Sequence, residues 1–268
     1  MIIKAYVVPH PPIILPEIGR GEEKKIQNTI DAYQRMAREI AELRPDTVII
    51  CSPHAPMFAD GFFIASGSRD SASLRSFGFP NIQETVLLDR EFTDALLERL
   101  DRADIPTALM PGRDEDHGFL IPIHFVHETI RDFKVVHVGI SGLSCETHRK
   151  FGALLAETSR AFGRRAVFIA SGDLSHVLKA DGPYGLRPEG PVFDAEIARI
   201  FREGDLEALF EFDPRSVNRA AECGLRSFQM MVGALEERPV KSELFSYEGT
   251  FGVGYAVASV TPNDDLSE

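Results

Sequence analysis

The chain has 268 residues, of which 44% are hydrophobic and 26% are charged, a balance typical of a globular protein with a sizeable core. Its 41 acidic residues outnumber 29 Lys and Arg residues, so the formal net charge is −12. This acidic excess argues against binding to nucleic acid or to an anionic membrane, because both require a basic protein surface.

The sequence shows no sign of secretion or of membrane insertion. Its first nine residues hold an apolar run too short for a signal peptide, and no run approaches the roughly 18 apolar residues of a membrane span. Cys51, Cys145 and Cys223 lie far apart and form no C-x-x-C pair, which argues against a disulfide framework or a structural zinc site. We therefore expect a cytoplasmic protein.

Strands and helices are expected to alternate along the chain. Apolar and β-branched runs predict strands at residues 2–8, 47–51, 62–66, 84–89, 107–110, 135–140, 167–170, 241–247 and 252–260. Helical spacing of apolar residues predicts helices at residues 22–43, 90–102, 144–161, 193–202, 206–210 and 224–237. Residues 67–80 lack a clear period and are expected to form a long loop. This order predicts one α/β domain over residues 1–268, with three α/β/α layers around a mixed, mostly parallel sheet.

Four histidines follow expected strands. His10 and His54 each come directly after a strand in a stiff, Pro-flanked stretch, and His117 and His176 each follow a turn after a strand. Ligands bind outside the carboxyl ends of the strands in open α/β sheets, so we expect the four imidazoles to gather at one edge. Two imidazoles and one carboxylate form the usual ligand set of non-haem Fe(II) oxygenases, which leaves three metal positions free for a chelating substrate and O₂.

Six motifs in chain order resemble a known family. They are Pro9-His10-Pro11-Pro12, Ser52-Pro53-His54, Asp116-His117-Gly118, Ser171-Gly172-Asp173-Leu174-Ser175-His176, Glu222-Cys223-Gly224 and Tyr247-Glu248-Gly249-Thr250-Phe251-Gly252-Val253-Gly254-Tyr255. Together they resemble the class III extradiol ring-cleavage dioxygenases, the LigB-type catalytic subunits, and equally the related MEMO-like proteins. The resemblance runs nearly from end to end of the chain.

The dioxygenase resemblance implies a role for each site residue. It implies that His10, His54 and Glu222 bind the metal, and that His176 is the catalytic acid and base over the substrate ring. His117 would be a second catalytic or substrate-contacting group. The implied cofactor is Fe(II), with Zn, Mn or Cu as alternatives, and the implied substrates are a catechol-type aromatic diol and O₂. The resemblance also implies two candidate partners, which are further copies of this chain in a homo-oligomer and an AMMECR1-like protein.

The third metal ligand is open between two neighbours. The MEMO-like proteins have a Cys-Gly pair where Cys223 and Gly224 stand, and a thiolate suits a metal-binding protein without ring-cleavage activity. Glu222 could instead be an ordinary acid at a helix N-terminus. Metal-assisted hydrolysis needs the same ligands and ranks last, because nothing marks a phosphate or amide pocket. The remaining histidines, His124, His127, His137 and His148, are assigned to the core or the surface, with His148 exposed to solvent. Residues 181–191 are a candidate lid.

Overall fold

The computed structural model describes residues 1–236 and 238–263. Its main sheet has eight strands in the order β6-β3-β7-β2-β8-β1-β10-β9. These strands are β1 (Ile2–Val8), β2 (Thr47–Ser52), β3 (Phe62–Ala65), β6 (Thr107–Met110), β7 (Lys134–Gly139), β8 (Ala166–Ser171), β9 (Val240–Glu248) and β10 (Tyr255–Pro262). Strands β1, β8, β2 and β7 are parallel, whereas β10 is antiparallel to both β1 and β9. The prediction of a mixed, mostly parallel sheet is therefore confirmed.

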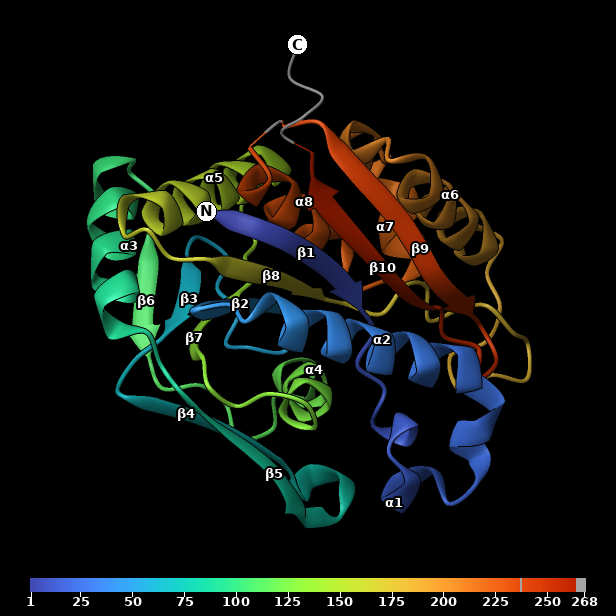
Figure 1. The fold of residues 1–268 in the computed structure, drawn as a ribbon. Coiled ribbons are helices and arrows are strands. Elements are labelled where there is room, and N and C mark those ends of the chain that lie inside the picture. Colours follow the sequence, from blue (N-terminus) through green and yellow to red (C-terminus); the bar gives the residue numbers. More distant parts are fainter. Residues whose placement is uncertain (237, 264–268) are drawn as a thin grey trace.

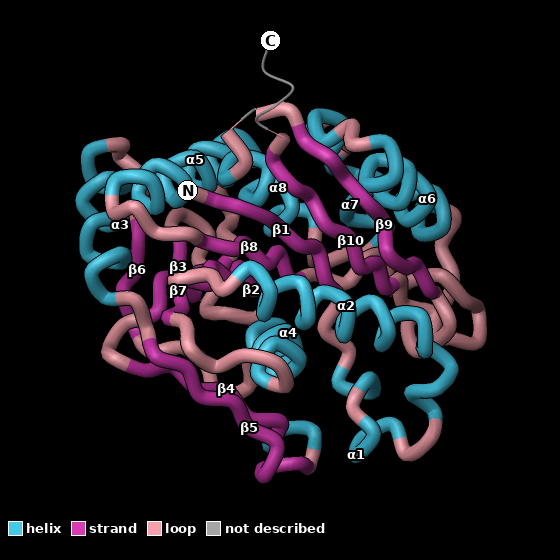
Figure 2. The backbone as a smooth tube through the Cα atoms, viewed as in Figure 1, coloured by secondary structure: helices cyan, strands magenta, loops and turns pink. Residues whose placement is uncertain are grey.

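Helices cover both faces of the sheet (Figures 1 and 2). The helices are α1 (Pro16–Gly19), α2 (Gln27–Leu43), α3 (Arg90–Arg102), α4 (His117–His127), α5 (Cys145–Ala161), α6 (Glu189–Glu203), α7 (Pro214–Ala220) and α8 (Leu225–Ala234). In Figure 1, α5 and α8 lie above the central strands, α3 lies to their left, and α2 and α4 lie below them. The predicted helix at residues 224–237 corresponds to α8, and Glu237 lies outside the described residues. Within the described residues, no helix is both long and apolar enough to cross a membrane.

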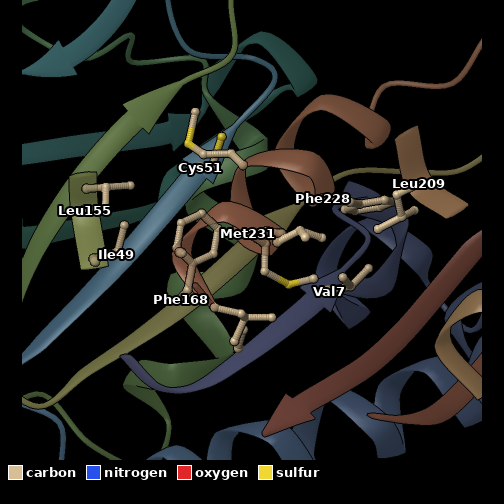
Figure 3. Packing of buried hydrophobic residues seen from close by; sticks show 14 of the residues in the cluster. Val7, Ile49, Cys51, Leu155, Phe168, Leu209, Phe228 and Met231 are labelled. Atoms are coloured by element: carbon tan, nitrogen blue, oxygen red, sulfur yellow. The ribbon is translucent and has the colours of Figure 1, made fainter. Parts of the chain in front are cut away.

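Alternation along the central strands divides the core between the two faces. Val7, Ile49 and Phe168 share one buried cluster with Leu155 of α5 and Met231 of α8, as Figure 3 shows. Their immediate neighbours along the same strands belong to a second cluster, which packs against α2 and α4. Successive side chains of a strand point to opposite faces, so strands this apolar must be covered by helices on both sides.

Two sequence predictions are wrong. Residues 67–80 are not a loop, because β4 (Arg69–Leu74) and β5 (Phe79–Leu87) pair as an antiparallel hairpin around a 3₁₀ turn at Arg75–Phe77. The buried positions of β4 include Asp70 and Ser73, so polar residues mask the strand pattern. His148 is not solvated but fully buried, because its ring donates to the Ser144 carbonyl and accepts the Ser141 N–H.

Candidate metal centre and pocket

Three adjacent strands end at the candidate site. His10 follows β1, His54 follows β2, and Asp173 follows β8, which lies between them in the sheet (Figure 1). The buried His10 is held at two points: its backbone N–H donates to Asp173 Oδ1 at 2.7 Å, and its Nδ1 lies 2.9 Å from Ser171 Oγ. These contacts orient the imidazole and leave Nε2 free to face His54.

Three donor atoms converge in front of these strand ends. His10 Nε2 lies 3.0 Å from His54 Nε2 and 3.6 Å from Cys223 Sγ. All three donor atoms lie within 4.8 Å of one another. Metal bonds of about 2.1 Å to nitrogen and about 2.3 Å to sulfur place two donors of one ion about 3.0 to 3.6 Å apart. Two of the three donor pairs have this spacing, so the three residues are a candidate site for one divalent metal ion.

The electrostatics of the two imidazoles favour the unprotonated form that a metal requires. Burial lowers the pKa of His10 well below 6.5. Burial, and then the nearby His10, lower the pKa of His54 to about 3. The Cys223 thiol behaves in the opposite way, because burial raises its pKa well above the usual value. Metal binding would have to displace the thiol proton, which makes such binding depend on pH.

A close backbone crossing directs Cys223 toward the histidines. A Cβ atom built on Gly172 would lie only 2.1 Å from Gly224 Cα, so this crossing requires glycine. The Cys223 N–H donates to the Asp173 carbonyl at 3.2 Å, and the Asp173 N–H donates to Cys223 Sγ at 3.2 Å. The loop after β8 thus fixes the thiol on the side of the metal centre.

The structure does not bring Glu222 to this centre. Its Oε2 accepts the Leu225 N–H at 2.6 Å, at the N-terminus of α8. Glu222 lines a different pocket of about 830 Å³, together with Cys145 and Arg226. Burial raises the pKa of its carboxyl to about 7. The donor atoms that converge on the two histidines thus include the Cys223 sulfur and not the Glu222 carboxylate, which the sequence had led us to expect there.

His117 reaches the same pocket by a route that the sequence did not predict. Strand β6 runs parallel to β3, and β3 is antiparallel to β7, so β6 ends at the opposite edge of the sheet from β1 and β2. Residues 111–116 return the chain, and His117 begins α4 with Asp116 as the N-cap. The His117 ring stacks on that of His54 with 4.0 Å between centroids. Burial lowers the pKa of His117.

His176 faces the pocket from the loop after β8. Its Nδ1 is buried and has no hydrogen-bond partner among the described residues. The ring lies 5.5 Å from that of Tyr184, measured between centroids. All four histidines therefore line one pocket: His10, His54 and His176 follow strands that end there, as predicted, and His117 joins them at the start of α4.

The pocket has a volume of about 780 Å³ and mostly apolar or aromatic walls. Its aromatic residues are Phe77, Tyr184, Phe251 and Tyr255. Phe77 comes from the turn of the β4–β5 hairpin and lies 5.2 Å from the His117 ring. Tyr184 belongs to residues 181–184, the part of the candidate lid that lines the pocket. Apolar walls with few polar groups are typical of small-molecule sites.

Sequence reasoning missed Asp173 as a site residue. Asp173 lines the pocket, is 6% exposed, and has its Oδ1 4.0 Å from His10 Nε2. Burial raises the pKa of its carboxyl. Its signal in the sequence was its place in the turn directly after an apolar strand, three residues before His176.

Comparison with known proteins agrees with this geometry. Residues 4–258 match the family model of the catalytic LigB subunit of aromatic ring-opening dioxygenase. The chain belongs to the LigB family. Members of this family are generally metal-dependent, which accords with a candidate site of two histidines and one cysteine.

Two relatives and one solved structure are similar to this chain. A Clostridium acetobutylicum protein known by its locus name is 40% identical over 262 residues, which cover 94% of this chain and 56% of that protein. The chain thus spans little more than half of that relative. The 2-aminophenol 1,6-dioxygenase beta subunit of Pseudomonas sp is 27% identical over 286 residues, covering 96% of this chain and 92% of the subunit. The crystal structure of an uncharacterized Escherichia coli K12 protein has a similar fold, with a TM-score of 0.60 at 16% identity, and covers 96% of this chain and 99% of that one.

Proposed function

We propose that this LigB-family chain is an Fe(II)-dependent extradiol dioxygenase that opens an aromatic ring bearing two adjacent polar substituents. The observation that carries the proposal is the convergence of His10, His54 and Cys223, of which the two histidines line a pocket with aromatic walls. The name of the Pseudomonas relative supports an aminophenol as the substrate class, and the resemblance to the class III extradiol dioxygenases adds a catechol. Both atoms of O₂ enter the ring-opened product, so the reaction needs no external reductant.

The metal would be held by His10, His54 and Cys223, with Glu222 left outside the ligand set. When bound, it would supply Lewis acidity toward the two adjacent substituents and a path for electrons from the ring to O₂. Zinc, manganese and copper are alternatives to iron, and a thiolate ligand is well suited to zinc and copper. Metal analysis of protein purified without oxygen distinguishes them.

The protein's own residues would bind the ring and move its protons. His176 lines the pocket, and its imidazole can take a proton from a substrate hydroxyl or amino group. His117 and Asp173 lie on the same pocket and can contact the polar substituents. Tyr184 and Phe251 in the walls can enclose the ring and exclude water.

Metal content tests the ligand set directly. We expect His10→Ala, His54→Ala and Cys223→Ser to lose most of the bound metal. Glu222→Gln serves as the matched control, because it changes the adjacent side chain, which faces the other pocket. Loss of metal in the Glu222 variant with retention in the Cys223 variant would restore the carboxylate as the third ligand.

Oxygen uptake tests the reaction. The anaerobically purified, metal-loaded protein would be mixed with catechol, protocatechuate or 2-aminophenol, and O₂ consumption and product absorption would be followed. Stoichiometric O₂ uptake with ring opening supports the dioxygenase. Full metal occupancy without uptake on any of these compounds speaks against this substrate class.

The second candidate is a MEMO-like metal-binding protein without ring-cleavage activity. Cys223 favours it, because a thiolate occupies the place where an oxygenase usually has a carboxylate. Tight copper or zinc binding that depends on Cys223, together with no O₂ uptake, would select this candidate. Both candidate functions are compatible with a homo-oligomer or with an AMMECR1-like partner. Light scattering of the purified chain tests whether it self-assembles.

A further inference from the structure

A fifth histidine, which the proposed chemistry does not use, lies buried beside the site. His137 of β7 stands between two carboxylates: its Nδ1 is 2.6 Å from Asp70 Oδ2, and its Nε2 is 3.3 Å from Asp116 Oδ2. His137 is 1% exposed and Asp116 is fully buried. The imidazole stacks on Phe119 with 4.5 Å between ring centroids, within the apolar layer that contains α4.

The two carboxylates favour a cationic imidazole at position 137, which has a hydrogen bond to Asp70 and, without hydrogen-bond geometry, an ion-pair contact with Asp116. A buried carboxylate is stable only when it is paired and hydrogen-bonded, and removal of its partner is costly. Asp116 Oδ1 also accepts the Phe119 N–H at 2.9 Å, at the N-terminus of α4, where a negative charge is favoured. Asp70 and Asp116 come from β4 and from the start of α4, so an imidazolium at His137 ties both segments to the main sheet.

The cluster reaches the metal centre through two hydrogen bonds. Ser52 Oγ donates to Asp116 Oδ1 at 2.6 Å and accepts the His54 N–H at 3.1 Å. Asp116 also directly precedes His117, whose ring stacks on His54. One carboxylate therefore fixes the backbone of a candidate metal ligand and the helix start that carries its stacking partner.

We propose that His137 is a positioning residue for the metal centre, acting through Asp116 and Ser52 on His54 and His117. This inference rests on the proposed metal site. A general contribution to core stability would affect unfolding alone, whereas positioning also affects metal affinity. Residues that orient metal ligands from outside the coordination shell typically change metal affinity by about 10- to 100-fold.

The chain offers a matched control in His148. It is as buried as His137 and lies edge-on to Phe62 at 4.8 Å, but its ring nitrogens bond only to the backbone of Ser141 and Ser144. The test compares wild type, His137→Gln and His148→Gln by anaerobic Co(II) titration, followed by visible absorption, and by urea unfolding. We expect about 10-fold or more weaker Co(II) binding in the His137 variant, wild-type binding in the His148 variant, and lower stability in both.

Wild-type Co(II) affinity in folded His137→Gln would overturn the inference, as would an equal loss in His148→Gln. If the His137 variant does not fold, Ser52→Ala replaces it, because this change leaves the ion pairs intact and cuts only the link to His54. Unchanged affinity in Ser52→Ala would then refute the proposed link.

The proposed metal site can fail separately. If wild type binds no Co(II), the positioning role is tested in the metal-free protein by the imidazole NMR signals of His54 and His117. They should shift in the His137 or Ser52 variant and remain in place in the His148 variant. Unmoved signals in the His137 or Ser52 variant would reject the positioning role.

Discussion

Replacement of His137 by Gln should remove a pH-dependent contribution to stability. Burial alone lowers the pKa of His137, but the carboxylates of Asp116 and Asp70 outweigh burial and raise this pKa from 6.5 to about 9. A base whose pKa is raised by folding stabilises the protein fully below its unfolded pKa, and this contribution is lost as pH rises through the folded pKa. The difference in pKa corresponds to about 3 kcal/mol, present at pH 6.5 and largely lost at pH 9.

The measurement is the free energy of unfolding in urea between pH 6.5 and 9, with a chelator present. The stability difference between wild type and His137→Gln should shrink by up to about 3 kcal/mol across this window. The difference in unfolding free energy between the two proteins is used because the contributions of groups that titrate alike in both cancel. In His148→Gln the difference should stay flat, because burial lowers the pKa of His148 to about 4, outside the window. A constant difference for the His137 variant would refute a buried imidazolium.

Three further changes test other parts of the molecule. Gly172→Ala places a Cβ against Gly224 and should destabilise the fold by about 1–3 kcal/mol and weaken Co(II) binding, as measured by urea unfolding and titration; wild-type values for both would contradict the close crossing. His176→Ala should retain the metal and lower turnover by about 10²- to 10⁴-fold in the O₂-uptake assay, and loss of metal would make His176 a ligand. Burial raises the pKa of Glu84, but its hydrogen bonds to two histidines of α4 outweigh burial and lower this pKa to about 2. Glu84→Gln should therefore remove up to about 3 kcal/mol of unfolding free energy, a contribution that wild type has above pH 4.5 and loses as pH falls toward 2. If urea unfolding shows the same loss of stability between pH 4.5 and 2 in both proteins, the pairing is excluded.

The sequence was sufficient for the part of the site that short-range patterns control. His10 and His54 follow apolar strands that end at proline, and chain direction alone brings such strand ends to one edge of a parallel sheet. His176 follows β8 in the same way. These positions need no knowledge of long-range contacts, because each strand carries its own residue to the edge.

The rest of the site depends on contacts between distant segments. His117 follows a strand that runs in the opposite direction and arrives through a return loop, which strand periodicity does not reveal. His137 appears in the sequence as one polar residue in an apolar strand, and its partner Asp70 lies 67 positions away in a hairpin without an apolar pattern. The orientation of Cys223 depends on the crossing of two glycine backbones, which only the folded structure shows.

The proposed ligand set, with Cys223 in place of Glu222, would leave the metal with the same net charge. Two neutral imidazoles leave Fe(II) with its full charge of +2, and either a carboxylate or a thiolate lowers it to +1. Charge therefore does not distinguish the two neighbours as ligands. Their positions differ: the Glu222 carboxylate caps α8, and the Cys223 sulfur lies 3.6 Å from His10 Nε2. Asp173 places a carboxyl oxygen 4.0 Å from the same nitrogen. The site can thus neutralise a dication with a bound substrate anion, so the cysteine alone does not exclude oxygen chemistry.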